Sequence, residues 1–521
     1  MLAITNLAGR RTLVEAYDTV PGGDPFAVSK GMFTELAGEL AGPAAAGMTA
    51  CELEQHLDER GRDLLRQLLQ EHLDLRAARE EQQAREDRAP ATGTDGITRT
   101  RRESGHGRLL ATLFGTVRVT RCAWRHPGAV NFCPADAALS LPAGRHSHSL
   151  AMLAALEAAR GSFGAAHAAI TRRCGPVIGK RQAEEAVVRA AADIAAFYEA
   201  RVPEPCTSST LLVISADCKG IVMRSGALRA ATARAAARLG KMRTRLTAGE
   251  KPNRKRMAAL AAVYDAEPAQ RRPHDVIALP GGRNGSRTPR KGPQARAKWL
   301  AGSVRRAPAE VIAAAFDEAE ARDPRHLRTW VVLVDGAEHQ LDLIRAEAAR
   351  RGAAVHIVID LVHVLEYIWG AAWSLHATGD PAAEDWVAVK ALAVLAGDSA
   401  RAAGEISAEA DAAGLPGSQR HGADACIRYL NGKHEYLRYD QALEKGWPIA
   451  TGIIEGACRH LIADRLDISG ARWGLDGAEA VLTLRAVISN GDFDEYWRFH
   501  LEREHQRLYP RIKQGQYTLG A

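Results

Sequence analysis

The sequence is poor in features that mark several classes of protein. Aromatic residues make up only 5% of the 521 residues, and alanine is frequent, which favours helix. No uninterrupted apolar run reaches about 18 residues, so we expect no membrane-spanning helix. The opening segment, MLAITNLAGRRTLVEAYD, lacks a long apolar stretch and carries acids early, which argues against a signal peptide. We therefore expect a cytoplasmic protein.

The eight cysteines form no Cys-x-x-Cys pair, which argues against a zinc ribbon. Their scatter along a long chain is typical of reduced thiols in a cytosol. Hydrophobic residues make up 46% of the chain, enough for several buried cores, and the length predicts three or four units. The net charge of +7 suits a polyanionic partner without establishing one.

Changes in pattern along the chain predict seven regions. Helical spacing, turn residues and β-rich runs decide their boundaries. The regions are a helical N-terminal region (1–90), a β-hairpin around Gly115 with linkers (91–147), a helix-turn-helix-like pair (148–205), the first part of an α/β core (206–363), an all-α insertion (364–446), the second part of the core (447–495) and an aromatic, basic tail (496–521).

The central region predicts a mixed sheet. LLVISAD is a buried strand, a tight turn at Lys219-Gly220 leads to a second strand, and RMAALAAVYD is a third. RTWVVLVD and AAVHIVID are the fourth and fifth strands, with a helix between them. Three adjacent strands followed by a strand–helix–strand unit are the order expected of a ribonuclease-H-like sheet.

Three acidic residues are the candidate catalytic and metal-binding residues. Asp217 and Asp335 each end an apolar strand, and Glu455 lies near the start of a helix in WPIATGIIEGACRH. Each has a structural explanation when taken singly, because Asp is common in turns. Together they predict a cluster of carboxylates for hard divalent cations, which is the centre of two-metal phosphoryl transfer.

Two polar residues after the fifth strand are weaker candidates. His363 is a possible accessory residue that would contact the substrate or leaving group, and a half-buried helix histidine is the alternative. Asp360 ends the strand and is expected to cap the helix that follows.

Basic residues near these positions are candidates for contact with DNA phosphates. Four of them lie at the turn of the helix-turn-helix outline, and five lie in two basic stretches, expected to be loops, on either side of the third strand. Two more follow Glu455. Solvated surface is the alternative for all of them. The residues are Arg172, Arg173, Lys180 and Arg181; Arg254, Lys255, Arg256, Arg290 and Lys291; and Arg459 and Arg472.

Several stretches of the chain resemble the DDE transposases of bacterial insertion sequences, in particular the ISKra group. They are SADCKGIVMR, RTWVVLVDG, HIVIDLVHVLEYIW and, most specifically, the stretch from WPIATGIIEGACRH through SGARWG to NGDFDEYW. The resemblance extends upstream through FGTVRVTR, LSLP and GSFGAAHAAITRRCG to about residue 50, and so covers most of the chain. Cys218 departs from the pattern, because Gly is expected after the first acid.

The resemblance implies a ribonuclease-H-like catalytic domain with an all-α insertion before the third acid. It implies DNA cleavage and strand transfer with two Mg²⁺ (or Mn²⁺) ions, and the matching triad is Asp217, Asp335 and Glu455. The implied partner is double-stranded DNA, as terminal inverted repeats and target DNA. A homo-oligomer associated with the nucleoid is also implied.

Two other functions remain open on the sequence. A catalytically inactive, element-derived DNA-binding protein needs only the helix-turn-helix outline and the basic stretches. A ribonuclease-H-like nuclease would cut without joining strands. A glycosidase with paired carboxylates would leave the basic stretches and the strand order unexplained.

Overall fold

The computed structural model of the chain describes residues 23–86, 89–202, 209–238, 254–278, 280 and 288–510. The chain divides into two compact units, one formed by Met1–Asp193 with Asp494–Ala521 and the other by Ile194–Phe493. Helices and strands are mixed, as predicted. No helix in these ranges is long and apolar enough to cross a membrane.

The first unit opens with a helical hairpin and a β-hairpin. Helix α1 (Ala27–Ala41) and the short α2 (Pro43–Ala46) precede α3 (Ala50–Glu86), and α1 packs against α3. Strands β1 (Ala91–Thr92) and β2 (Thr98–Arg99) form a small ladder. The long strands β3 (Arg101–Thr112) and β4 (Gly115–Arg125) pair as the predicted antiparallel hairpin and pack on α3.

The same unit continues with short helices that contain the helix-turn-helix outline. They are α4 (Pro134–Ala138), α5 (His148–Arg160), α6 (Phe163–Cys174) and α7 (Lys180–Ala190). Helix α5 packs against both α6 and α7. The side chains of Ser147 and Ser162 cap α5 and α6 by accepting from backbone N–H groups. The predicted pair of helices is therefore α6 and α7, with α5 packed against both.

Most of the described part of the predicted C-terminal tail forms helix α20 (Phe493–Leu508). Buried Asp193 accepts from Arg507 at 2.6 Å and contacts His500 Nδ1 at 2.6 Å. Tyr496 donates its hydroxyl to the carbonyl of Ala190. The aromatic and basic residues of the segment therefore hold a helix in the first unit; residues 511–521 lie outside the described ranges.

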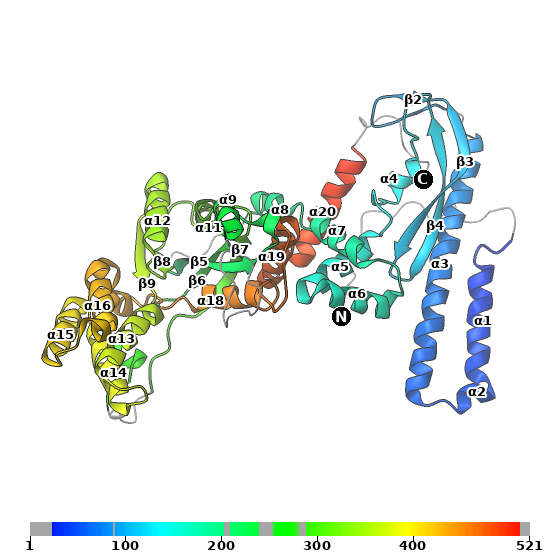
Figure 1. Ribbon diagram of the computed structural model, residues 1–521. Helices are drawn as coiled ribbons and strands as arrows, with labels where there is room; N and C mark the ends of the chain where they lie inside the picture. The colour runs from blue at the N-terminus through cyan, green and yellow to red at the C-terminus, as the bar shows by residue number, and fades with distance from the viewer. Residues whose placement is uncertain are drawn as a thin grey trace. The chain divides into compact units, whose positions relative to one another are not determined.

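The second unit is built on a five-stranded mixed sheet (Figure 1). Its strands, in the order β7-β6-β5-β8-β9, are β7 (Ala295–Ser303), β6 (Lys255–Ala266), β5 (Leu211–Val222), β8 (Trp330–Val334) and β9 (Val355–Ile359). The β7–β6 and β6–β5 pairs are antiparallel, and the β5–β8 and β8–β9 pairs are parallel.

Two details of the predicted sheet are wrong. Strand β5 continues through Lys219 and Gly220 instead of turning, and it pairs with β6 as far as Val222. A Cβ atom on Gly220 would come within 2.7 Å of the Lys255 side chain, so this glycine serves close cross-strand packing. The segment predicted as the third strand is therefore β6, the second strand of the sheet along the chain. Strand β7 lies inside a basic stretch that was predicted to be a loop, and its Trp299 and Leu300 are buried although charged residues precede them.

Helices cover the sheet and follow its strands. Outside the helical segment after β9, the helices of this unit include α8 (Ile194–Ala200), α9 (Ala230–Arg238), α10 (Pro273–Val276), α11 (Pro308–Arg322), α12 (Glu338–Arg351) and α19 (Leu475–Asn490), with a short 3₁₀ turn, η1 (Ser225–Ala227). Helix α11 packs on β5, β6 and β7, and α19 packs on β7. Trp330 and Phe316 are almost wholly buried where α11 meets the sheet.

The segment between β9 and Gly446 is entirely helical, as predicted. Its elements are α13 (Leu361–Leu375), α14 (Pro381–Leu395), α15 (Ser399–Ala412), α16 (Gly417–Gly432), η3 (His434–Tyr436) and α17 (Tyr439–Glu444). The chain then returns through α18 (Gly452–Ala457), which runs directly into a π-helical turn, η4 (Cys458–Ala463). Such turns often lie at functional sites.

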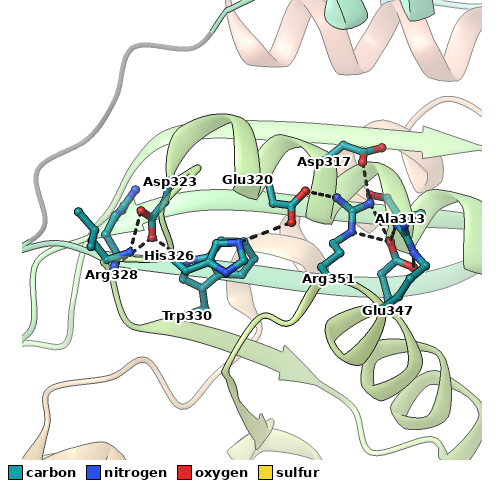
Figure 2. Close-up of polar contacts among 11 residues, drawn as sticks. Ala313, Asp317, Glu320, Asp323, His326, Arg328, Trp330, Glu347 and Arg351 are labelled. Carbon is teal, nitrogen blue, oxygen red and sulfur yellow. Dashed lines mark hydrogen bonds and ion pairs between the residues drawn. The ribbon is translucent and has the colours of Figure 1, made fainter.

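A polar network holds the start of β8 in place (Figure 2). Asp323 accepts hydrogen bonds from the backbone N–H of Arg328 and the indole of Trp330, both at 2.9 Å. The Arg328 guanidinium donates to Asp265 at 2.6 Å and to the Leu211 carbonyl at 2.7 Å. Arg351 at the end of α12 donates to carboxylates of α11. These contacts position β8 against β5.

We predict that Arg328→Met destabilises the second unit by at least about 2 kcal/mol. The substitution removes the main neutralising partner of buried Asp265 and leaves the Leu211 carbonyl without this donor. Denaturant unfolding followed by circular dichroism measures the change. Arg350→Met, which removes an exposed ion pair with Glu347, is the control and is expected to have little effect. Equal losses from both variants would contradict the structural role.

Candidate metal centre

Three aspartates lie in a row across the parallel half of the sheet. Val334 pairs with Ile359 at the ends of β8 and β9, so Asp335 and Asp360 directly follow the two strands. The last pair of β5 with β8 is Ser215 with Leu333, and Asp217 and Asp335 both lie two residues further on. Because parallel strands run in the same direction, the register brings these residues to the same level of neighbouring strands.

Asp217 is a mid-strand residue, which corrects its predicted place at a strand end. It still pairs with Leu260 of β6, because β6 follows β5 along its whole length. The β8 ladder stops earlier, at Ser215, so one side of β5 is open at Asp217. The carboxylate accepts from the backbone N–H of Cys218 at 2.6 Å and from the thiol of Cys458 at 3.0 Å.

Cys218 sits in a straight strand instead of the expected turn. Neighbouring side chains of a strand leave on opposite faces, so the thiol and the Asp217 carboxylate diverge. Desolvation, followed by the charges of Asp217 and Asp335, raises the pKa of Cys218 to about 11. The thiol is therefore protonated near neutral pH in the metal-free protein.

Asp360 is fully buried and connects two elements that are distant in sequence. Its carboxylate accepts from the backbone N–H of Val362 at 3.2 Å, which confirms the predicted helix cap. It also accepts from the backbone N–H of Thr451 at 3.2 Å and from the Thr451 hydroxyl at 2.8 Å. The end of β9 and the start of α18 are thus joined through one carboxylate.

Glu455 and His363 complete a group with Asp360. The Thr451 hydroxyl lies 3.1 Å from Glu455 Oε1, and His363 Nδ1 lies 3.4 Å from Asp360 Oδ2. One ligand atom from each of Asp360, His363 and Glu455 lies within 4.8 Å of the others. Two carboxylates and an imidazole are a suitable ligand set for a divalent cation, so this group could bind one metal ion.

The group differs from the predicted one. Glu455 belongs to it, and His363, predicted only as an accessory, is a possible ligand. Asp217 and Asp335 are not members of this group, although the sheet register brings them to neighbouring strands. Helix α18 packs on β5 and β6, and the thiol of Cys458, about one helical turn after Glu455, contacts Asp217.

Charge at the centre favours a bound cation. Desolvation raises the pKa of Glu455, and the negative charge of Asp360 raises it further. The Thr451 hydrogen bond and the nearby His363 act in the opposite direction. Glu455 is solvent-exposed, so its ionised form is only disfavoured relative to a free carboxylate, and a divalent cation would stabilise that ionised form.

The predicted DNA-binding residues fall into two sets. Eight of them are exposed: Arg172 and Arg173 at the end of α6, Lys180 and Arg181 at the start of α7, Arg290, Lys291, Arg459 and Arg472. The other three are Arg254, which precedes β6, and Lys255 and Arg256, which begin it. Lys255 pairs with Asp467, and Arg256 donates to the Val304 carbonyl at 2.7 Å, so both stabilise the fold. Residues 241–253 and 283–287 of the two basic stretches lie outside the described ranges.

Three residues of the centre were missed as functional residues by sequence reasoning. Asp360 was recognised as a helix cap, but it ends a strand parallel to β8, so its position in the sheet is equivalent to that of Asp335. Thr451 precedes Glu455 by about one helical turn, which is a detectable local spacing. Cys458 offers no such signal, because its contact with Asp217 spans 241 residues.

We predict that Glu455→Gln stabilises the metal-free protein at neutral pH. A carboxyl whose pKa is raised on folding makes the native state less stable as pH rises above its unfolded pKa, and Gln does not ionise. Thermal unfolding in a chelator should show a higher midpoint for the variant, with the difference shrinking as the pH is lowered. Glu435→Gln, at an exposed position, is the control. A destabilised Glu455→Gln protein would contradict the assigned charge cost.

Comparison with known proteins does not identify the function of the candidate centre. Neither protein-family models nor curated proteins gave a match to this chain. What the centre can do chemically therefore follows from its side chains, their register and their contacts.

Proposed function

We propose that the protein is a metal-dependent DNA phosphoryl transferase, a transposase of the DDE type. The observation that carries the proposal is the parallel register of β5 and β8, which brings Asp217 and Asp335 to the same level, together with the contact of Asp217 with Cys458 on the helical segment that bears Glu455. Carboxylates on a rigid sheet and a packed helix are held firmly enough to bind catalytic cations.

The strand order supports the same proposal. The order β7-β6-β5-β8-β9, with antiparallel pairs on one side of β5 and parallel pairs on the other, is compatible with the ribonuclease-H-like arrangement that the resemblance implies. The helical segment between β9 and α18 corresponds to the expected all-α insertion before the third acid. Fold alone does not establish activity, so the proposal depends on the carboxylates.

The residues divide into ligands and supporting groups. Asp217, Asp335 and Glu455 are the proposed ligands of two Mg²⁺ or Mn²⁺ ions. Asp360 lies within ligand distance of Glu455, so it is a further possible ligand, and it also positions Glu455 through Thr451. Bound ions would activate a water or 3′-hydroxyl and stabilise the leaving oxygen. His363, half-buried beside Asp360, is placed to act as a further ligand or to hold a proton near the leaving group.

Substitution of the proposed ligands tests the chemistry. Asp217→Asn, Asp335→Asn and Glu455→Gln should each lower Mn²⁺-dependent nicking of plasmid DNA by about 100-fold or more, because each removes charge stabilisation in the transition state. Binding to DNA, measured by fluorescence anisotropy, should persist. Asp342→Asn, an exposed residue of α12, is the control and should keep wild-type activity. Unchanged nicking by one of the three variants would remove that residue from the centre.

Charge reversal at the α6–α7 turn tests the DNA contacts. Arg172→Glu with Lys180→Glu should weaken binding of duplex DNA and reduce its salt dependence by about one unit of slope per lost phosphate contact. Both side chains are exposed, so their replacement should leave the buried core of the first unit intact. Arg101→Glu with Arg160→Glu, exposed on β3 and α5, makes the same change in net charge and is the matched control. Binding that is equally affected by both changes would point to net charge alone.

Product analysis separates the proposed function from the two alternatives. A transposase joins a cleaved 3′ end to a target plasmid, whereas a nuclease without strand transfer yields only nicked DNA. A DNA-binding protein without catalysis yields neither product in Mg²⁺ or Mn²⁺. The wild-type protein incubated with DNA ends and a target plasmid distinguishes the three outcomes directly.

A further inference from the structure

Strand β8 leaves its ladder with β5 just before the two aspartates of the sheet that are proposed ligands. The last pair of the ladder is Ser215 with Leu333, and the Ser215 hydroxyl donates to the Leu333 carbonyl at 3.1 Å. Asp217 and Asp335 lie two residues further on, where the strands are no longer paired. The sheet is therefore open between these two residues, and their separation does not come from the ladder.

The side chain of Gln340 bridges this opening. Its Nε2 donates to the Ala216 carbonyl at 2.7 Å. Leu212 donates its backbone N–H to Thr329 on the β8 side, and alternate residues of a strand face the same neighbour, so the Ala216 carbonyl also faces β8. Continued pairing in the same register would give that carbonyl the backbone N–H of Asp335 as its donor. Gln340 thus takes the place of the next ladder hydrogen bond.

Gln340 is joined to Asp335 through a short turn that has its own contacts. Asp335 Oδ1 accepts from the backbone N–H of Ala337 at 2.9 Å, and α12 begins one residue later, so Gln340 lies in its first turn. Gly336 has a φ of +90°, and a Cβ atom there would lie 3.0 Å from the Tyr429 hydroxyl, which donates to the Asp335 carbonyl at 3.2 Å. The Gln340 side chain therefore links the turn that carries Asp335 back to β5.

The amide of Gln340 also has an acceptor that the bridge does not use. Because a carbonyl oxygen only accepts, the amide nitrogen is the group that contacts Ala216, and Oε1 is left for another donor. Oε1 is shielded from solvent and accepts no hydrogen bond from the part of the chain that the structure describes. The Gln70 amide, in contrast, both donates to the Arg118 carbonyl and accepts from the Arg118 N–H. A glutamine that bridges to a strand edge therefore has no need of a spare oxygen.

We propose that Gln340 is a positioning residue for a divalent cation held between Asp217 and Asp335. Its Nε2 fixes the opening between the strands, and its Oε1 accepts a hydrogen bond from the hydration shell of the cation, since Mg²⁺ keeps several waters in protein sites. This role rests on the proposed function, because it needs a cation at these two acids. A cap that only satisfies the Ala216 carbonyl is the competing role.

Mn²⁺ binding to the full-length protein, followed by electron paramagnetic resonance, separates the two roles. Gln340→Met should weaken Mn²⁺ affinity about tenfold at the site that Asp335→Asn removes, because groups that orient metal ligands and bound waters contribute about that much. Gln70→Met removes the same kind of bridge from β4 in the other unit, so it is the matched control and should leave Mn²⁺ affinity unchanged. Gln340 is half-buried and Met has a similar length, so the variant should fold, which circular dichroism checks.

Nicking of plasmid DNA gives a second readout. Gln340→Met should raise the Mn²⁺ concentration for half-maximal nicking about tenfold. Most of the rate should return at saturating Mn²⁺, because the ligands themselves remain in place. Loss of folded protein would instead lower the rate at every Mn²⁺ concentration.

The outcomes distinguish this role from the proposed function. If Asp335→Asn removes a Mn²⁺ site and Gln340→Met binds Mn²⁺ like the wild type, Gln340 is only a strand cap and the proposed function stands. If Asp335→Asn removes no site, no cation lies at these acids, and both proposals are overturned. Weaker Mn²⁺ binding by Gln340→Met, with Gln70→Met unchanged, supports the positioning role.

Discussion

The parallel pairing of β8 with β5 on one side and β9 on the other is the constraint on which the candidate centre depends. It brings Asp217, Asp335 and Asp360 to the same level of three neighbouring strands. A slip of one residue in either ladder would turn the carboxylate to the other face of the sheet. The buried network around Arg328 and Asp323 guards against such a slip, because it ties the start of β8 to β5 and β6.

Asp360 joins the two ends of the helical segment that is inserted after β9. The helical segment leaves the sheet directly after this residue, and the chain returns at Thr451, 91 residues later. There the Asp360 carboxylate accepts hydrogen bonds from the backbone N–H and the hydroxyl of Thr451. Entry and exit of the segment are therefore held at one buried point. Because Thr451 also contacts Glu455, the same residue that anchors the returning chain to Asp360 also positions the third acid.

Clustered carboxylates give the centre its affinity for cations, and they repel one another when no cation is bound. The raised pKa of Glu455 and the proximity of Asp360 mean that the metal-free state carries unfavourable repulsion. A divalent cation removes that repulsion, so affinity for metal and instability without it have the same origin. In the metal-free protein, desolvation and neighbouring carboxylates raise the pKa of the Cys218 and Cys458 thiols, so both are protonated near neutral pH.

The order of elements could be predicted from the sequence, because apolar periodicity and turn residues are local signals. These signals predicted the β-hairpin, the α6–α7 pair, the mixed sheet, the helical insertion and the cap at Asp360. The Lys219–Gly220 turn and the strand at Trp299 were misjudged, because pairing with partner strands overrides local propensity there. Asp217, Asp335, His363 and Glu455 could be selected by residue type and position. Only the tertiary structure decided that Glu455 joins Asp360 and that Cys458 contacts Asp217, since those contacts join residues far apart in the chain and carry no local pattern.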